Sequence, residues 1–193
     1  MRVSIAADLD YFFPEPADVL LAVEAIPMKD QKLVRDKLTV AGEATPLRSF
    51  QEHGTPGRSQ WTEANDRVQI RYEALVDVER PPLSIAGLDV PPRRELPPDV
   101  VHYLFPSRYC ESDRLETYAM SKFGHRSGGD LVLEMTDWIR HNFEYVPGSS
   151  DNSTTATDSF LRRQGVCRDY SHVLITLARA MGVPARMVSV YAP

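Results

Sequence analysis

The residues best suited to chemistry lie between Gly165 and Tyr170, where a cysteine stands at the predicted start of a helix. The first four N–H groups of a helix have no intrahelical partner, and its N-terminal end carries a partial positive charge. A thiolate there is stabilised relative to the thiol, and such sites lower a cysteine pKa from about 8.5 toward roughly 3.5 to 7.5. Cys167 is therefore the candidate nucleophile, with the positive charge of Arg168 beside it. The local pattern leaves one alternative open, a buried cysteine that serves as a small apolar residue.

The helix that carries Cys167 is predicted from the spacing of its apolar residues. It buries one stripe and is ended by Gly182 and Pro184. The stripe consists of Val173, Leu174, Leu177, Ala178 and Met181. A strand is expected over residues 186–191, where apolar residues recur after the proline.

Three more helices are expected upstream. Asp113 begins the first with the spacing of a capping box, and Gly124 ends it. Asp130 caps the second, whose apolar stripe of Leu131, Met135, Trp138 and Ile139 ends near Asn142. The third is short, begins after residues 155–158 and stops at Gly165.

The first 80 residues read as β structure. Apolar and polar residues alternate over 67–79, interrupted only at Leu75, which predicts an antiparallel strand with one buried face. A second alternating strand begins at residue 3 and is expected to stop at Pro14 and Pro16. Weaker strands are predicted over residues 19–25 and 33–40, and a loop over residues 51–60.

Residues 81–98 hold six prolines, which predicts a stiff connector without regular structure. The expected organisation is therefore an N-terminal β domain (1–80), the connector (81–98) and a mainly helical domain (99–193). The fold class is α+β.

Composition excludes several functional classes. The chain has 193 residues, a net charge of −5, 42% hydrophobic and 25% charged residues, as in an ordinary globular protein. An acidic balance without a basic stripe argues against nucleic-acid binding, and no apolar run is long enough to cross a bilayer. Asp8 and Asp10 interrupt the N-terminal apolar stretch, and the two cysteines, Cys110 and Cys167, stand far apart. We expect free thiols and a cytoplasmic location.

The order of residues around Cys167 resembles the core motif of the transglutaminase-like superfamily. That motif is a Gly-x-Cys-x-Asp helix start, an apolar helix with an arginine near its end, then Gly-Ile/Val-Pro-Ala-Arg and a strand ending in tyrosine. The matching residues are Gly165, Cys167, Asp169, Arg179, Gly182, Val183, Pro184, Ala185, Arg186 and Tyr191. Residues 138–145 and 154–156 are similar to the microbial branch of the superfamily, which has an N-terminal β domain.

The resemblance implies a papain-like fold in which a Cys-His-Asp triad transfers an acyl group from an amide through a thioester. Cys167 would be the nucleophile, and its own N–H a donor to the oxyanion. The superfamily's catalytic histidine and aspartate lie on later strands, whereas only Asp169 and His172 follow Cys167 here. His172 lies about 140° around the helix from Cys167, so packing is its expected role. Asp169 is expected to bond free N–H groups, and Arg186 to form a structural ion pair.

The remaining histidines offer little for catalysis. His53 falls in the predicted loop and His102 just after the connector, while His141 lies near a helix end. His125, in a glycine-rich loop that lacks the rest of a phosphate-binding motif, is the weak candidate for an alternative base. Neither CxxC nor HExxH occurs, so no metal or cofactor is expected.

Two functions follow from these patterns. The first is thiol-dependent acyl transfer on protein or peptide substrates, by a cysteine protease or transglutaminase-like enzyme of which this chain is an N-terminal portion that would be inactive alone. The alternative is a non-catalytic binding or scaffolding module that lacks the triad base. The strand over residues 186–191 would leave an unpaired sheet edge, which predicts a homo-oligomer.

Overall fold

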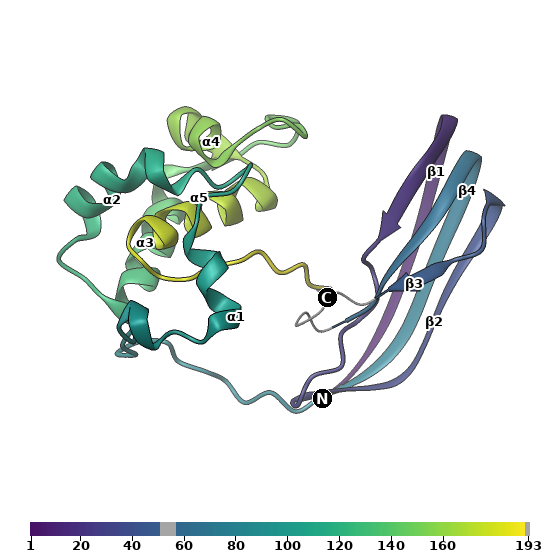
Figure 1. Ribbon diagram of the computed structural model, residues 1–193, viewed down its shortest axis with the longest axis horizontal. Helices are drawn as coiled ribbons and strands as arrows, with labels where there is room; N and C mark the ends of the chain where they lie inside the picture. The colour runs from purple at the N-terminus through teal and green to yellow at the C-terminus, as the bar shows by residue number, and fades with distance from the viewer. Residues whose placement is uncertain (51–56, 192–193) are drawn as a thin grey trace. The chain divides into compact units, whose positions relative to one another are not determined.

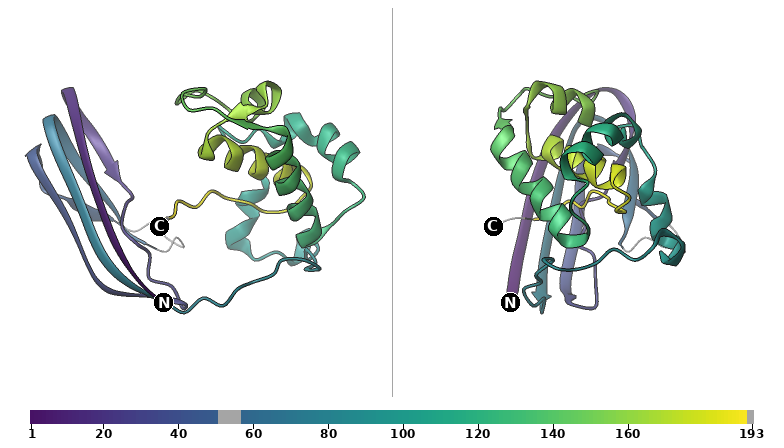
Figure 2. Two further views of the ribbon diagram at one scale, coloured as in Figure 1. Left: turned by 180° about the vertical axis from the view of Figure 1, so that it is seen from behind. Right: turned by 90° about the vertical axis from the view of Figure 1, so that its left-hand side faces the viewer.

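A computed structural model describes residues 1–50 and 57–191 and divides into two compact units, residues 1–82 and the residues from 83 onward (Figure 1). The first unit is an antiparallel sheet and the second is mainly helical (Figure 2). The predicted α+β class, with an N-terminal antiparallel sheet followed by the helical part of a papain-like domain, is confirmed.

The sheet is built around one long central strand. Its order is β1-β4-β2, with the short β3 paired to β4 beyond the end of β2, and every pairing is antiparallel. The strands are β1 (Arg2–Leu21), β2 (Gln31–Ala44), β3 (Arg48–Phe50) and β4 (Ser59–Val78). Because β4 has neighbours on both sides, its inward residues are almost fully covered. These are Val68, Ile70, Tyr72, Ala74 and Val76, as the alternation predicts.

The expected end of the first strand at Pro14 and Pro16 is wrong. β1 continues through both prolines to Leu21, and its register against β4 shifts between Phe13 and Ala17. β1 lies at the edge of the sheet, where a proline without an N–H is tolerated at a bulge. The strand predicted over residues 19–25 is the end of β1, and that over residues 33–40 lies within β2.

The loop predicted over residues 51–60 ends earlier than expected, because β4 already begins at Ser59. Residues 51–56, which include His53, lie outside the described residues.

The helical unit packs around its last helix, α5 (Cys167–Ala180), whose Val173 and Leu177 are fully buried. Before α5 come α1 (Pro98–Val101), α2 (Glu116–Phe123), α3 (Gly128–Asn142) and α4 (Ala156–Arg162), the short parallel strands β5 (Glu144–Tyr145) and β6 (Gln164–Gly165), and the 3-10 turns η1 (Arg93–Glu95), η2 (His102–Leu104) and η3 (Ser112–Leu115). No helix among the described residues combines the length and the apolar character needed to cross a membrane.

Two predicted caps are wrong, and one helix begins earlier than predicted. Asp113 lies inside η3, so it does not cap α2. Asp130 is the third residue of α3, and its carboxylate accepts a hydrogen bond from the Gly87 N–H at 3.0 Å. α4 begins at Ala156 because Thr155 is its N-cap, with Asp158 completing the capping box.

The glycine pair before α3 allows a close backbone approach. A Cβ atom on Gly128 would lie 1.9 Å from the Leu88 carbonyl oxygen, and one on Gly129 would lie 1.5 Å from the Ile85 carbonyl oxygen. The Gly129 N–H donates to the Leu88 carbonyl at 2.7 Å. The pair therefore docks the proline-rich segment onto the start of α3.

The strand predicted over residues 186–191 is absent from the described structure, where these residues have no regular secondary structure. A strand needs a neighbouring backbone to pair with, and no described strand pairs with this segment. The predicted end of α5 at Gly182, with φ of +80°, is confirmed.

Candidate active site

Cys167 is the first residue of α5 and its side chain is exposed. The helix start is therefore where the sequence predicts it, and the alternative of a buried apolar cysteine is excluded. The Val166 carbonyl accepts the N–H groups of Asp169 and Tyr170 at 2.9 and 3.1 Å. The N–H groups of Cys167 and Arg168 have no acceptor among the described residues. They are the free donors that a helix start offers to a negative charge.

Asp169 fixes the backbone that precedes the thiol. Its side chain is 1% exposed, and Oδ2 accepts hydrogen bonds from the Val166 N–H at 2.7 Å and from the Ser150 hydroxyl at 2.6 Å. The predicted role of Asp169, bonding free N–H groups at the helix start, is confirmed. Its carboxylate cannot serve as a base at Cys167 without losing these bonds.

Gly165 makes room for that carboxylate. A Cβ atom at this position would lie 2.6 Å from the Asp169 Cβ and 3.0 Å from its Oδ2. The first glycine of the Gly-x-Cys-x-Asp pattern is therefore required by the aspartate four residues later. Gly165 also pairs with Tyr145 across the β5–β6 ladder, which brings β5 next to the cysteine.

The loop between β5 and α4 is fastened to the start of α5. Arg168 donates to the Asp151 carbonyl at 2.6 Å and to the Ser150 hydroxyl at 3.2 Å. Its Nε lies 3.7 Å from Asp169 Oδ1. The Ser150 hydroxyl thus hydrogen-bonds to both Arg168 and Asp169, the second and third residues of α5. Nothing in the sequence pattern singled out Ser150, because its partners are about twenty positions away.

Two tyrosines come from the elements that adjoin the cysteine, Tyr170 from α5 and Tyr145 from β5. Tyr170 follows Cys167 by three residues and therefore lies on nearly the same face of the helix. Its ring lies 5.7 Å from that of Phe143 and 6.2 Å from that of Tyr145, and burial together with the nearby Glu144 carboxylate raises its pKa. Tyr145 is 59% exposed. No pattern in the sequence marks either ring as a functional residue.

His172 packs in the interior, as predicted. Its ring stacks on that of Tyr109 with centroids 5.3 Å apart and planes within 7°. Burial, followed by the charge of Arg168, lowers the pKa of His172. Its Nδ1 is buried and has no hydrogen-bond partner among the described residues.

Comparison with known proteins assigns a family to part of the chain. Residues 117–193 match the model of the transglutaminase-like superfamily. The helical unit therefore carries a transglutaminase-like domain. The crystal structure of a putative cysteine protease from Cytophaga hutchinsonii superposes with a TM-score of 0.85 at 32% identity, over 95% of this chain and 65% of that one.

Mycobacterial relatives extend the likeness to both units. An uncharacterized protein of Mycobacterium tuberculosis is 27% identical over 174 residues, which is 83% of this chain and 55% of the relative. One from Mycobacterium leprae is 33% identical over 60 residues, or 31% of this chain and 22% of the relative. The chain thus spans about half the length of the Mycobacterium tuberculosis relative.

The other histidines of this transglutaminase-like chain have partners away from the thiol. His125 lies 3.3 Å from Glu134, and His141 contacts the Asp137 carbonyl at 2.6 Å. His102 lies against Tyr103, with centroids 3.8 Å apart. None of them hydrogen-bonds to Cys167 in the part of the chain that the structure describes. The weak candidate base, His125, is instead paired with a carboxylate on α3.

The two arginines of the motif bind backbone and ring rather than carboxylates. Arg179 donates to the Ala185 carbonyl at 2.7 Å and to the Phe105 carbonyl at 2.9 Å. Arg186 lies over the Tyr103 ring at 5.6 Å and donates to its hydroxyl at 3.4 Å. Contrary to the prediction, Arg186 forms no ion pair with any of the described residues. With no strand formed over residues 186–191, its side chain is exposed and reaches the nearest ring.

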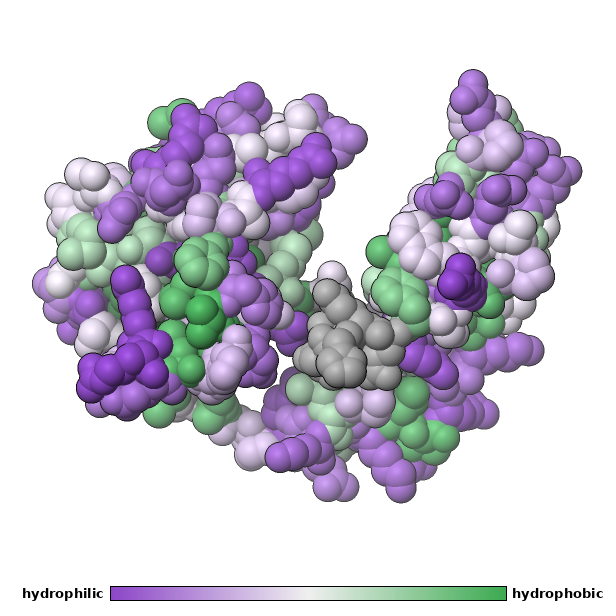
Figure 3. All heavy atoms as spheres, viewed as in Figure 1, coloured by the Kyte–Doolittle hydropathy of each residue, from purple (hydrophilic) through white to green (hydrophobic). Residues whose placement is uncertain are grey.

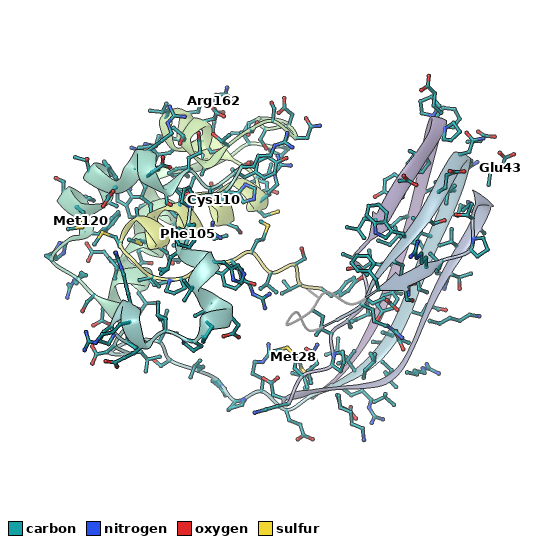
Figure 4. The ribbon with its side chains drawn as sticks, in the orientation of Figure 1. Met28, Glu43, Phe105, Cys110, Met120 and Arg162 are labelled. Atoms are coloured by element: carbon teal, nitrogen blue, oxygen red, sulfur yellow. The ribbon has the colours of Figure 1, made fainter. Side chains whose placement is uncertain are left out.

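The second cysteine contrasts with the first. Cys110 is a free thiol, as predicted, but it is 4% exposed and lies within the helical unit (Figure 4), and burial raises its pKa. No three His, Cys, Asp or Glu side chains among the described residues gather in a way that could hold a metal ion.

Proposed function

We propose that the transglutaminase-like domain performs thiol-dependent acyl transfer on amide groups of protein or peptide substrates, with Cys167 as the nucleophile. The observation that carries the proposal is an exposed thiol on the first residue of a 14-residue helix, with two free backbone N–H groups beside it. A helix start favours the thiolate, and free N–H groups can stabilise an oxyanion. The superfamily and the cysteine-protease neighbour from Cytophaga support it.

The reaction has two steps. The Cys167 thiolate attacks the amide carbon, a thioester forms, and the C–N bond breaks as the amine leaves with a proton. Water or another amine then attacks the thioester, gives up a proton and releases the thiolate. The N–H of Cys167 is the proposed first oxyanion donor. The resemblance implies a histidine that moves both protons, and the described contacts assign none to that role.

Alkylation tests the nucleophile. At neutral pH iodoacetamide should modify Cys167 faster than it modifies the thiol of glutathione, because a helix start activates a thiol. Cys110 should remain unmodified in the folded protein, and a Cys110→Ala variant should show the same rate at Cys167. Mass spectrometry of the two cysteine peptides gives both rates. A Cys167 rate no higher than that of glutathione would refute an activated thiol.

A binding module remains the second candidate, because no described histidine bonds to Cys167. Turnover separates the two functions. Ammonia release and new N-termini from casein should appear with the native protein and disappear in Cys167→Ala. If casein binds equally well to both proteins and neither product forms, the binding module is the better description.

We also propose a cytoplasmic location and self-association. Two free cysteines support the first, and cell fractionation with antibody detection tests it. The outer edges of β1 and β2, which have no strand beside them among the described residues, support the second. Light scattering at micromolar concentration should show a dimer or larger species, and a monomer there would contradict it.

A further inference from the structure

The short strand β5 has one open edge next to the cysteine. The Glu144 N–H donates to the Arg163 carbonyl at 2.9 Å, and the Val146 N–H donates to the Gly165 carbonyl at 3.1 Å. Alternate residues of a strand point their backbone groups to opposite sides. The N–H and C=O of Tyr145 therefore point away from β6, and neither takes part in a hydrogen bond within the described residues.

This edge lies at the nucleophile. Tyr145 is directly opposite Gly165 in the ladder, and Cys167 follows Gly165 after one residue. The Tyr145 side chain is also available, since it is 59% exposed and its ring lies 6.2 Å from that of Tyr170. An unpaired donor, an unpaired acceptor and an exposed ring thus lie on the strand that pairs with the residue two positions before Cys167.

We propose that the edge of β5 at Tyr145 binds the acyl-donor peptide as an added strand and so brings its reacting amide to Cys167. This inference rests on the function proposed above. An extended peptide offers the complementary N–H and C=O, and its alternate side chains point to one face. The rings of Tyr145 and Tyr170 can contact an apolar or aromatic side chain on that face. The substrate class is therefore an extended peptide segment with an apolar residue near the amide.

Covalent probes of different backbone test the edge without a turnover assay. Iodoacetamide carries no peptide backbone, whereas acetyl-Phe-Ala-Gly chloromethyl ketone carries an extended one. The measured quantity is the ratio of their second-order rates at Cys167. Methylation of the peptide amide that pairs with the Tyr145 carbonyl should lower this ratio about five- to tenfold, the effect of losing one net hydrogen bond and adding a clash. Each amide is methylated in turn to find it.

Substitutions of Tyr145 distinguish the contribution of its ring from that of its backbone groups. Tyr145→Ala should lower the ratio about fivefold for the phenylalanine-containing probe but leave a probe with alanine in that place nearly unchanged. Tyr145→Phe should keep the native ratio. Met120→Ala, at a 54% exposed residue of α2 (Figure 4), is the matched control and should have no effect. Circular dichroism confirms that each variant is folded.

The outcomes are distinguishable. If no methylated peptide loses rate in the native protein, the added-strand proposal is overturned, whatever the variants do. If the ratio of the two labelling rates falls as the protein concentration rises, while light scattering shows a dimer, a second copy occupies the edge. The proposal is then overturned as well. Failure of the proposed function appears elsewhere, in an iodoacetamide rate at Cys167 no higher than that of glutathione.

Discussion

The sheet and the helical unit differ in how many polar side chains they bury. In the sheet, Arg2, Arg67 and Arg71 pair with aspartates of neighbouring strands on the exposed face, while the buried side is apolar apart from Gln60 and Thr62. In Figure 3 hydrophilic residues accordingly cover much of the visible surface of both units. Among the described residues, the sheet unit buries one carboxylate, that of Glu24, whose side chain is 5% exposed and pairs with Arg58, whereas more polar side chains are buried in the helical unit. Its buried polar residues are Ser112, Thr154, Thr157, Ser159, Asp169, His172 and Thr176.

The difference agrees with the chemistry proposed for the helical unit. A buried polar group costs free energy unless it is hydrogen-bonded, so folding alone favours few buried polar groups. In the helical unit one buried carboxylate lies at the start of α5, where Asp169 and Arg168 fix the loop that precedes α4. Each unit contains one of the two tryptophans, Trp61 and Trp138, so fluorescence in a Trp→Phe background follows each unit separately.

The largest effect is expected in the sheet. Ile70→Ala removes a 2% exposed side chain from the centre of β4 and should lower the free energy of unfolding of the sheet by about 3 to 4 kcal/mol. Urea denaturation followed at Trp61 measures it. Gln69→Ala, one residue away on the exposed face, should change it by less than about 0.5 kcal/mol. If Ile70→Ala and Gln69→Ala lowered the free energy of unfolding equally, the buried apolar face of β4 would not be the main source of the stability of the sheet.

Loss of the buried carboxylate should be nearly as large. Asp169→Ala leaves the Val166 N–H and the Ser150 hydroxyl without their acceptor and should lower the free energy of unfolding of the helical unit by about 3 kcal/mol. Denaturation followed at Trp138 is the measurement. Asp10→Ala, which removes an exposed ion pair with Arg67, is the control and should have little effect. If Asp169→Ala and Asp10→Ala lower the free energy of unfolding by the same amount, the buried carboxylate is no more important than an exposed one.

A smaller effect is expected at the glycine that faces this carboxylate. Gly165→Ala places a Cβ 2.6 Å from that of Asp169 and should lower the free energy of unfolding of the helical unit by about 2 kcal/mol, as overpacking does. It should also slow iodoacetamide labelling of Cys167. Gly148→Ala, with φ of +80° and open space around it, isolates backbone strain and should leave the labelling rate unchanged. If iodoacetamide labels Cys167 at the native rate in Gly165→Ala, the position of the Asp169 side chain does not affect the thiol.

The smallest effect is a pH dependence confined to the helical unit. Because the pKa of His172 is lowered from its ordinary value of 6.5, the unfolded chain binds the proton more tightly than the folded one. Stability contributed by neutral His172 is therefore full above pH 6.5, falls as the pH drops below it, and levels off below the folded pKa. His172→Gln should remove this dependence, and His102→Gln should not. Denaturation at several pH values, followed at Trp138, checks it.

Local sequence patterns correctly predicted the elements whose structure depends on residues close together in the sequence. The alternation around Ile70 and Tyr72 located the central strand, and the residues from Gly165 to Gly182 located α5 from its start at Cys167 to its end. The patterns gave wrong predictions where pairing with a distant segment decides the structure. Pro14 and Pro16 were expected to end a strand, but a strand at the edge of the sheet can lack their N–H groups.

The sequence by itself predicted the α+β class, the resemblance to the transglutaminase-like superfamily and the position of the candidate nucleophile, because period-two and helical patterns and the Gly-x-Cys-x-Asp motif are local. Only the tertiary structure decided that Ser150 and Arg168 fasten a loop to the start of α5, that Tyr145 presents an open backbone edge there, and that residues 186–191 form no strand. Hydrogen bonds between segments depend on which backbones meet, and no pattern along one segment contains that information.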